Sequence, residues 1–156
     1  MKRDSKLSSV LHVLLHLAHS ERPMTSEQMA GMLGTNPVLV RRVLAGLRER
    51  GYISSERGHG GGWAITCDLA QVTLRDVYDA VGAPTVFAMG NRNEHSACLV
   101  EQVVNASLED AFQEAEALLV KRLGEVTLAD LSREFNRNYD NHPHRRPEHE
   151  HTNDHE

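Results

Sequence analysis

The chain has 156 residues, of which 40% are hydrophobic and 25% are charged. These proportions are ordinary for a globular protein, and the length suffices for one domain with a core plus a helical arm. No apolar run approaches the roughly 20 residues that a membrane span needs. No secretory signal peptide is recognised, and two cysteines build no disulfide framework. The sequence therefore predicts a cytoplasmic protein without a membrane partner.

The net charge of −5 is unevenly distributed along the chain. Residues 1–60 contain nine Lys and Arg against five Asp and Glu, a net charge of +4, whereas residues 61–156 carry −9. A basic first part joined to an acidic remainder suggests that only the first part contacts phosphate. The acidic total therefore does not exclude a nucleic-acid-binding protein.

Three helices are expected in the first 50 residues. Apolar residues at helical spacing over 7–18 predict the first. Thr25, with Gln28 three positions later, has the capping-box pattern of a short second helix that ends near Gly34. Asn36-Pro37 supplies a favoured N-cap and first residue for a third helix. The apolar residues assigned to the inward face of that helix are Leu39, Val43, Leu44 and Leu47.

A β-hairpin is predicted next, because short strands at 52–55 and 63–66 flank a glycine-rich turn over 56–62. Two helices, an arginine-bearing helix and a hairpin, in this order, are typical of a winged helix-turn-helix. Side chains near the start of such a recognition helix reach base edges, and an arginine of the wing can enter a narrow minor groove. The residues predicted to contact DNA are Thr25, Ser26, Asn36, Pro37, Val38, Val40, Arg41, Arg42, Arg57, His59 and Gly60.

The remaining chain predicts further helices. A capped helix is expected from Thr73 to Val81, a long one from about Ser107 to Leu123, and a short one after Thr127. The fold class is mainly α with a small β-hairpin wing: a winged helix-turn-helix plus a long dimerisation helix. The expected divisions are a DNA-binding domain at 1–82, a sensor or linker loop at 83–104, dimerisation helices at 105–136 and a disordered His-rich tail at 137–156.

Several of these segments resemble the Rrf-type family of bacterial winged helix-turn-helix regulators. The segments that carry the resemblance are 35–44, 47–53, Arg57-Gly58-His59-Gly60-Gly61-Gly62-Trp63, Val72–Val77 and Thr127–Leu131. The resemblance spans about residues 5–135 and implies a homodimer that binds a double-stranded DNA operator and usually represses transcription. It implies that the long helix holds the dimer. The dimerisation residues predicted on that helix are Leu108, Phe112, Ala115, Leu118 and Leu119.

The signal that such a regulator would sense is less defined. Cluster-binding members of that family carry three closely spaced cysteines before the dimerisation helix, whereas the corresponding loop here, about 88–104, holds only Cys98. We therefore expect no cofactor, and an iron–sulfur cluster with non-cysteine ligands stays an alternative. Oxidation or alkylation of Cys98 beside His95 is the simpler switch, against a loop cysteine without a role. Cys67 is expected to be buried and inert.

Histidines provide the remaining alternative, a metal-responsive regulator or a metal-binding protein. His12, His16 and His19 share one helical face, opposite the apolar one, at a spacing compatible with metal ligation. A solvated face or a dimer contact would show the same pattern. The His-rich tail could bind a divalent cation loosely. An enzyme is not expected, because no paired nucleophile and base and no nucleotide-binding loop are found.

Overall fold

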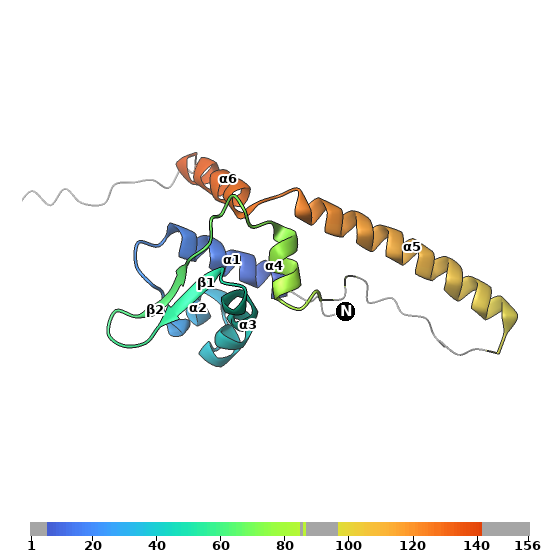
Figure 1. The fold of residues 1–156 in the computed structure, drawn as a ribbon, viewed down its shortest axis with the longest axis horizontal. Helices are drawn as coiled ribbons and strands as arrows, with labels where there is room; N and C mark the ends of the chain where they lie inside the picture. The colour runs from blue at the N-terminus through green and yellow to red at the C-terminus, as the bar shows by residue number, and fades with distance from the viewer. Residues whose placement is uncertain (1–5, 85, 87–96, 142–156) are drawn as a thin grey trace, which may run out of the picture.

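The computed structural model describes residues 6–84, 86 and 97–141. The elements in chain order are α1 (Lys6–His19), α2 (Ser26–Leu33), α3 (Pro37–Glu49), β1 (Ile53–Glu56), β2 (Gly62–Ile65), α4 (Leu74–Ala80), α5 (Leu99–Gly124) and α6 (Leu128–Asp140). Figure 1 shows α1–α4 and the hairpin gathered in one body, from which α5 extends. The predicted fold class, mainly α with a hairpin wing, is confirmed. No helix in the described ranges is long and apolar enough to cross a membrane.

The core of the body lies between α1, α3, α4 and the hairpin. On α1, the buried residues are Val10, Val13, Leu14 and Leu17, which recur at the spacing of one helical face as the sequence predicts. On α3, the buried residues are Val40, Leu44 and Leu47. The prediction is confirmed for Leu44 and Leu47 and wrong for Leu39, which is 39% exposed, while its neighbour Val40 is 2% exposed.

Local hydrogen bonds fix both the start of α2 and the turn between α2 and α3. The Thr25 hydroxyl accepts from the Gln28 amide at 3.2 Å, and the Gln28 side chain accepts from the Thr25 amide at 2.8 Å. Gly34 ends α2 in the left-handed conformation with φ of 61°, and the Asn36 side chain accepts from the Leu39 amide at 2.9 Å. These caps confirm the predicted end of α2 and start of α3, and they fix the short turn between the two helices.

The hairpin is anchored to the start of α2. β1 and β2 pair antiparallel from Ile53↔Ile65 to Glu56↔Gly62, within one residue of the predicted strands. In addition to the pairing of β2 with β1, Trp63 of β2 forms two backbone hydrogen bonds with Met24. The Trp63 amide donates to the Met24 carbonyl at 2.8 Å, and the Met24 amide donates to the Trp63 carbonyl at 2.9 Å. The Trp63 indole N–H also donates to the Ser26 hydroxyl at 2.9 Å. Because Met24 and Ser26 flank the N-cap of α2, these bonds fix the wing relative to the helix-turn-helix.

Two similar segments join the long helices to the body. Residues 72–77 read Val-Thr-Leu-Arg-Asp-Val and residues 126–131 read Val-Thr-Leu-Ala-Asp-Leu. Each forms a capping box, at the start of α4 and of α6. The two caps pair with each other, because the Leu74 amide donates to the Val126 carbonyl and the Leu128 amide to the Val72 carbonyl, both at 2.9 Å. The reciprocal pair ties the end of α5 to α4.

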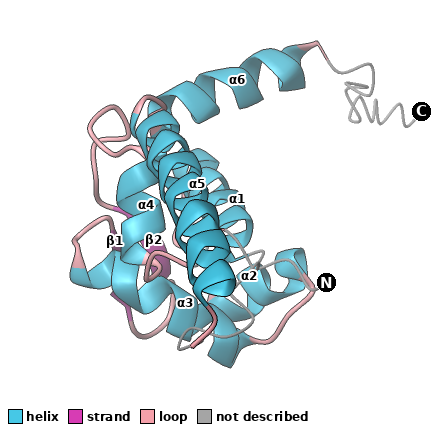
Figure 2. Cartoon of the chain, turned by 90° about the vertical axis from the view of Figure 1, so that its right-hand side faces the viewer, coloured by secondary structure: helices cyan, strands magenta, loops and turns pink. Residues whose placement is uncertain are grey.

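α5 begins at Leu99, about eight residues before the predicted start at Ser107. Residues 99–104, predicted to belong to a sensor loop, are therefore helical, which corrects that expectation. None of the 26 residues of α5 is buried. In Figure 2, which looks from the side on which α5 extends, the helix stands in front of the body and only its end is joined to α6.

Candidate nucleic-acid interface

The start of α3 presents exposed side chains of different chemistry. Val38 is 69% exposed, Arg41 and Arg42 are exposed, and the exposed Asn36 caps the helix through its side chain. Helix α3 is therefore amphipathic, with an apolar side in the core and a cationic side in solvent. Side chains near the N-terminus of a helix with this arrangement can reach base edges in a major groove.

A groove of about 530 Å³ lies between the start of α2, the outer side of α3 and the wing. Three arginines line it, two from α3 and one from the wing: Arg41, Arg48 and Arg57. Two glutamates, Glu27 and Glu56, line it as well. Backbone phosphates of DNA are bound mainly by such cationic side chains, so this groove carries the chemistry of a phosphate-contacting surface.

The sequence analysis missed Arg48 as a member of this surface. Arg48 stands in the last turn of α3, where a basic residue also interacts favourably with the helix dipole. It lies seven residues after Arg41, which is close to two helical turns and places both on the same side of α3. That spacing was visible in the sequence and could have identified Arg48.

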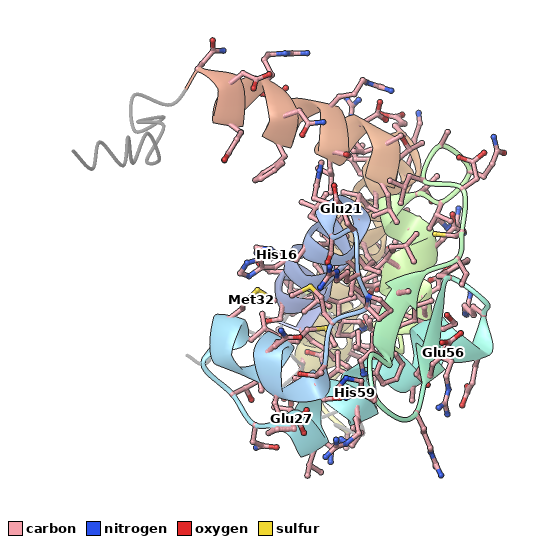
Figure 3. The ribbon with its side chains drawn as sticks, turned by 90° about the vertical axis from the view of Figure 1, so that its left-hand side faces the viewer. His16, Glu21, Glu27, Met32, Glu56 and His59 are labelled. Carbon is pink, nitrogen blue, oxygen red and sulfur yellow. The ribbon has the colours of Figure 1, made fainter. Side chains whose placement is uncertain are left out.

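Glu27 forms an exposed ion pair with Arg41 of α3. Its carboxylate lies 3.7 Å from the Arg41 guanidinium, and the two side chains are 68% and 53% exposed. An ion pair this exposed contributes little stability, so exchange of Glu27 for a phosphate or a guanine costs little. Figure 3 shows Glu27 at the same end of the molecule as His59 of the wing.

The wing tip exposes both side chains and backbone. Arg57, His59 and Gly60 are all exposed, as the predicted contact requires. Gly58 and Gly60 have φ of 104° and 77°, a region that side-chain-bearing residues rarely adopt. The glycines therefore form the tight tip and leave its backbone amides accessible to a nucleic-acid backbone.

Two of the predicted contacts at the helix-turn-helix are buried, and a third also caps a helix. Val40 is buried, as described above, so its side chain cannot reach a base. Ser26 is 6% exposed, and its hydroxyl accepts the Trp63 indole hydrogen. The Thr25 hydroxyl caps α2. Residues with a hydroxyl at a helix start serve the helix first. The Ser26 side chain is therefore withdrawn from solvent, whereas the half-buried Thr25 hydroxyl keeps its own hydrogen for donation, so a contact of Thr25 with DNA stays a prediction.

Arg42 lies on another side of α3 from Arg41. It lines a second cavity, of about 680 Å³, together with Lys6 of α1 and the apolar residues Leu39 and Val43. The two adjacent arginines therefore flank α3, one toward the wing and one toward α1. A recognition helix in a major groove has a phosphate strand on each side, so this placement suits contacts to both strands.

The predicted sensing residues are distributed over separate parts of the structure. Cys98 is exposed and immediately precedes α5. Cys67 follows β2 and is half-buried, and burial raises the pKa of its thiol, which keeps it protonated at neutral pH as expected for an inert cysteine. His95 lies outside the described residues. His12 and His16 are exposed on α1, with their Nε2 atoms 2.9 Å apart.

The predicted dimerisation residues lie on the exposed surface of α5. Leu108 is 44% exposed, Leu118 59% and Leu119 36%, Ala115 is exposed and Phe112 is half-buried. The first turns of α5 extend the apolar surface beyond the prediction with Leu99, Val100, Val103 and Val104, which are 50% to 73% exposed. Contiguous exposed apolar side chains of this kind are more common at interaction sites than on the rest of a protein surface.

Comparison with known proteins places this arrangement in a family. The Rrf2 family of transcriptional regulators, described as iron-dependent, matches residues 3–134. YwnA of Bacillus subtilis (strain 168), which is named as an HTH-type transcriptional regulator, is 27% identical to this chain over 128 residues, which cover 82% of this chain and 95% of YwnA.

Solved structures agree with this match. A protein from Lactobacillus plantarum, described as a transcriptional regulator, has a structure that matches this one with a TM-score of 0.69. Its sequence is 26% identical, and the match covers 88% of this chain and 99% of that one. The cysteine regulator CymR of B. subtilis is 21% identical with a TM-score of 0.60, over 86% and 98% of the two chains, and supports the fold alone. These relatives are regulators and not enzymes. The chain belongs to the Rrf2 family of helix-turn-helix transcriptional regulators.

Proposed function

We propose that this protein is a homodimeric, sequence-specific DNA-binding repressor. The observation that carries the proposal is the groove in which Arg41 and Arg48 of α3 face Arg57 of the wing. In the proposed complex α3 enters a major groove, with Val38 against a thymine methyl group and Arg41 at a base edge or phosphate. Arg57 enters the neighbouring minor groove, where negative potential is strongest when the groove is narrow.

The proposed dimer would cover apolar side chains of α5 that the described part of its own chain leaves exposed. The exposed apolar residues Val100, Val104 and Leu108 recur every four positions, and Leu118 and Leu119 continue the stripe toward the other end. A second copy of the same helix presents the same stripe, so a twofold interface can bury both. Two recognition helices related by a twofold axis would read a palindromic operator.

The test of DNA binding is fluorescence anisotropy on DNA from the promoter region of the protein's own gene. Arg41→Ala and Arg57→Ala should each weaken operator binding by about 1–3 kcal/mol if they read bases or groove shape. The matched control is Arg137→Ala on α6, an arginine 68% exposed in its side chain that pairs with Glu134 at 3.0 Å. Unchanged affinity in both test variants would reject this contact surface.

Glu27→Gln tests the same groove with a substitution that should strengthen DNA binding. Removal of the carboxylate beside Arg41 should tighten binding, because Arg41 then loses its competing partner and the groove loses one negative charge. The dependence of affinity on salt should become steeper at the same time. A Glu27→Gln protein with unchanged affinity and unchanged salt dependence would place Arg41 outside the interface.

The proposed dimer is tested by analytical ultracentrifugation. Replacement of Leu118 and Leu119 with Asp should produce monomers, because two carboxylates on each helix would be buried without partners in the interface. Circular dichroism on the same sample should show that the helices persist. A dimer that survives both substitutions would mean that α5 is not the interface.

A thiol switch at Cys98 stays a prediction, supported by the exposure of this residue next to α5. Tight operator binding that is lost on oxidant treatment, and kept in Cys98→Ser, would support it. Cys67→Ser is the matched control, because its half-buried thiol should not take part. Equal binding in the reduced and oxidised states would reject the switch and leave DNA binding intact.

An iron–sulfur cluster does not fit the residues that the structure describes. The sequence has two cysteines, one half-buried behind the wing and one before α5. Within residues 6–84, 86 and 97–141, no three His, Cys, Asp or Glu side chains gather closely enough to hold a metal ion. Thiolates dominate cluster ligation, so the iron in the family's description has no counterpart in the described part of this protein.

A further inference from the structure

Two histidines on α1 hold their ring nitrogens close together outside the DNA-binding surface. His12 and His16 are one helical turn apart, and the distance between their Nε2 atoms is 2.9 Å. Both side chains are exposed, and Figure 3 shows the His16 ring at the edge of the molecule, pointing away from it. Two imidazole nitrogens at this distance can share one proton or one metal ion.

We propose that His12 and His16 form a two-histidine chelate for a divalent transition-metal ion, with Ni²⁺ and Cu²⁺ preferred over Zn²⁺. The site is independent of the proposed DNA interface, since neither histidine lines the groove between α3 and the wing. The chain supplies two ligands, and water completes the coordination shell.

The preference for Ni²⁺ and Cu²⁺ follows from the angle that the distance imposes. With metal–nitrogen bonds of about 2.0–2.1 Å, nitrogens 2.9 Å apart subtend an angle of about 90° at the metal. Square-planar and tetragonal ions have neighbouring ligands at that angle. Tetrahedral Zn²⁺ requires about 109°, and hence nitrogens roughly 3.3 Å apart, so it would have to spread the two rings.

The protonation state of His16 also suits metal binding. Partial burial, followed by the neighbouring His12 and His19, lowers the pKa of His16. The ring is therefore mostly neutral at pH 7, which is the form that ligates metals. His19 is a neighbour in sequence but not a third ligand, because its Nε2 is hydrogen-bonded to the Ser132 hydroxyl at 3.0 Å and its ring lies tilted against Phe135 of α6, with 4.8 Å between the ring centroids.

The experiment uses the full-length protein and Ni²⁺ in a non-coordinating buffer at neutral pH. The histidines of the C-terminal tail would obscure the result, so a parent protein is made in which each is replaced by Asn: His142, His144, His149, His151 and His155. Isothermal titration calorimetry then counts the bound ions. The parent should bind one equivalent, and both His12→Asn and His16→Asn should lose it.

Two variants separate the chelate from general metal adsorption. His19→Asn should keep the equivalent, because His19 contacts α6. Ser8→His added to His16→Asn should restore it, because the exposed Ser8 lies one turn before His12 on α1 and recreates the spacing. Ser8→His added to His12→Asn should not, because positions 8 and 16 are two turns apart.

Stability provides an independent readout. Ligand binding to the folded state raises the melting temperature, so Ni²⁺ should raise that of the parent and leave that of His12→Asn unchanged. The proposal is overturned if His12→Asn binds as many Ni²⁺ ions as the parent. Binding of Zn²⁺ more tightly than Ni²⁺ would overturn the angle argument and the stated metal preference.

Discussion

The winged helix-turn-helix body and the long helix α5 differ in where their apolar side chains find partners. In the body, α1 and α3 bury apolar residues at the spacing of one helical face against other elements of the same chain. In α5, which is longer than any of them, no residue is buried. Periodicity in a sequence therefore indicates that a face will be covered, but not whether the cover comes from the same chain.

The largest difference in the free energy of unfolding should appear between a leucine of the core and a leucine of α5. Leu47 of α3 is 0% exposed and Leu118 of α5 is 59% exposed. Leu47→Ala should lower the free energy of unfolding by about 2–5 kcal/mol at every protein concentration, since it leaves a cavity. Leu118→Ala should act only through the proposed dimer, so its effect should vanish on dilution below the dimer dissociation constant.

Urea unfolding at several protein concentrations measures both variants. A Leu118→Ala protein as unstable as Leu47→Ala at the lowest concentration would show that α5 packs within its own chain. The comparison between the body and α5 would then fail.

The body was largely predictable because its signals are local. Thr25, Asn36, Thr73 and Thr127 each begin a helix by a cap whose partner lies three residues away. Such interactions are read directly from the sequence. The pairing of the caps at Thr73 and Thr127 joins segments 54 positions apart, and their shared Val-Thr-Leu-x-Asp pattern was the only sequence signal for it.

Two errors had physical causes that propensity and periodicity do not resolve. The start of α5 was placed too late because Val100, Val103 and Val104 are β-branched, which weakens the helix signal, although their spacing fits a helix. On α3, adjacent apolar residues at 39–40 and 43–44 fit two inward faces that differ by one position. Only packing into the shared core selects Val40 over Leu39.

A second contrast lies between two glycines in helices of the body. A Cβ atom on Gly46 of α3 would lie 2.1 Å from the Ala80 carbonyl oxygen at the end of α4, whereas one on Gly31 of α2 would meet nothing within 4 Å. Gly46→Ala should destabilise the protein by about 1–3 kcal/mol or more through overpacking. Gly31→Ala should stabilise it by up to about 1 kcal/mol through helix propensity. Thermal unfolding of both variants measures the difference, and equal effects would contradict the close α3–α4 contact.

The hydrogen bond that holds the wing should have a smaller effect on stability and a visible one on DNA binding. Ser26→Ala leaves the indole N–H of Trp63, a residue 6% exposed, without its acceptor. The loss should be about 1–3 kcal/mol, nearer the lower value because the two backbone bonds to Met24 remain. Trp63 is the single tryptophan of the chain, so its fluorescence reports the change directly. Unaltered emission and stability together would mean that this bond does not position the wing.

The smallest effect concerns the capping box that joins α5 to the body. The backbone amide of Thr127, and then its hydroxyl, donate to the Asp130 carboxylate and lower the pKa of Asp130. A carboxyl whose folded-state pKa is lowered stabilises the protein above its unfolded pKa of about 3.9. That contribution to stability is lost as the pH falls from the unfolded-state pKa through the lower pKa that Asp130 has in the folded protein.

Asp130→Asn should therefore reduce stability at pH 7 but have almost no effect once Asp130 is protonated in both states. Asn keeps an acceptor oxygen for Thr127 but no charge, which isolates the titration from the cap geometry. Urea unfolding of the two proteins at neutral pH and at acid pH measures this convergence. A constant difference across pH would mean that Asp130 acts through shape alone. The cap would then hold α5 against α4 without help from its charge.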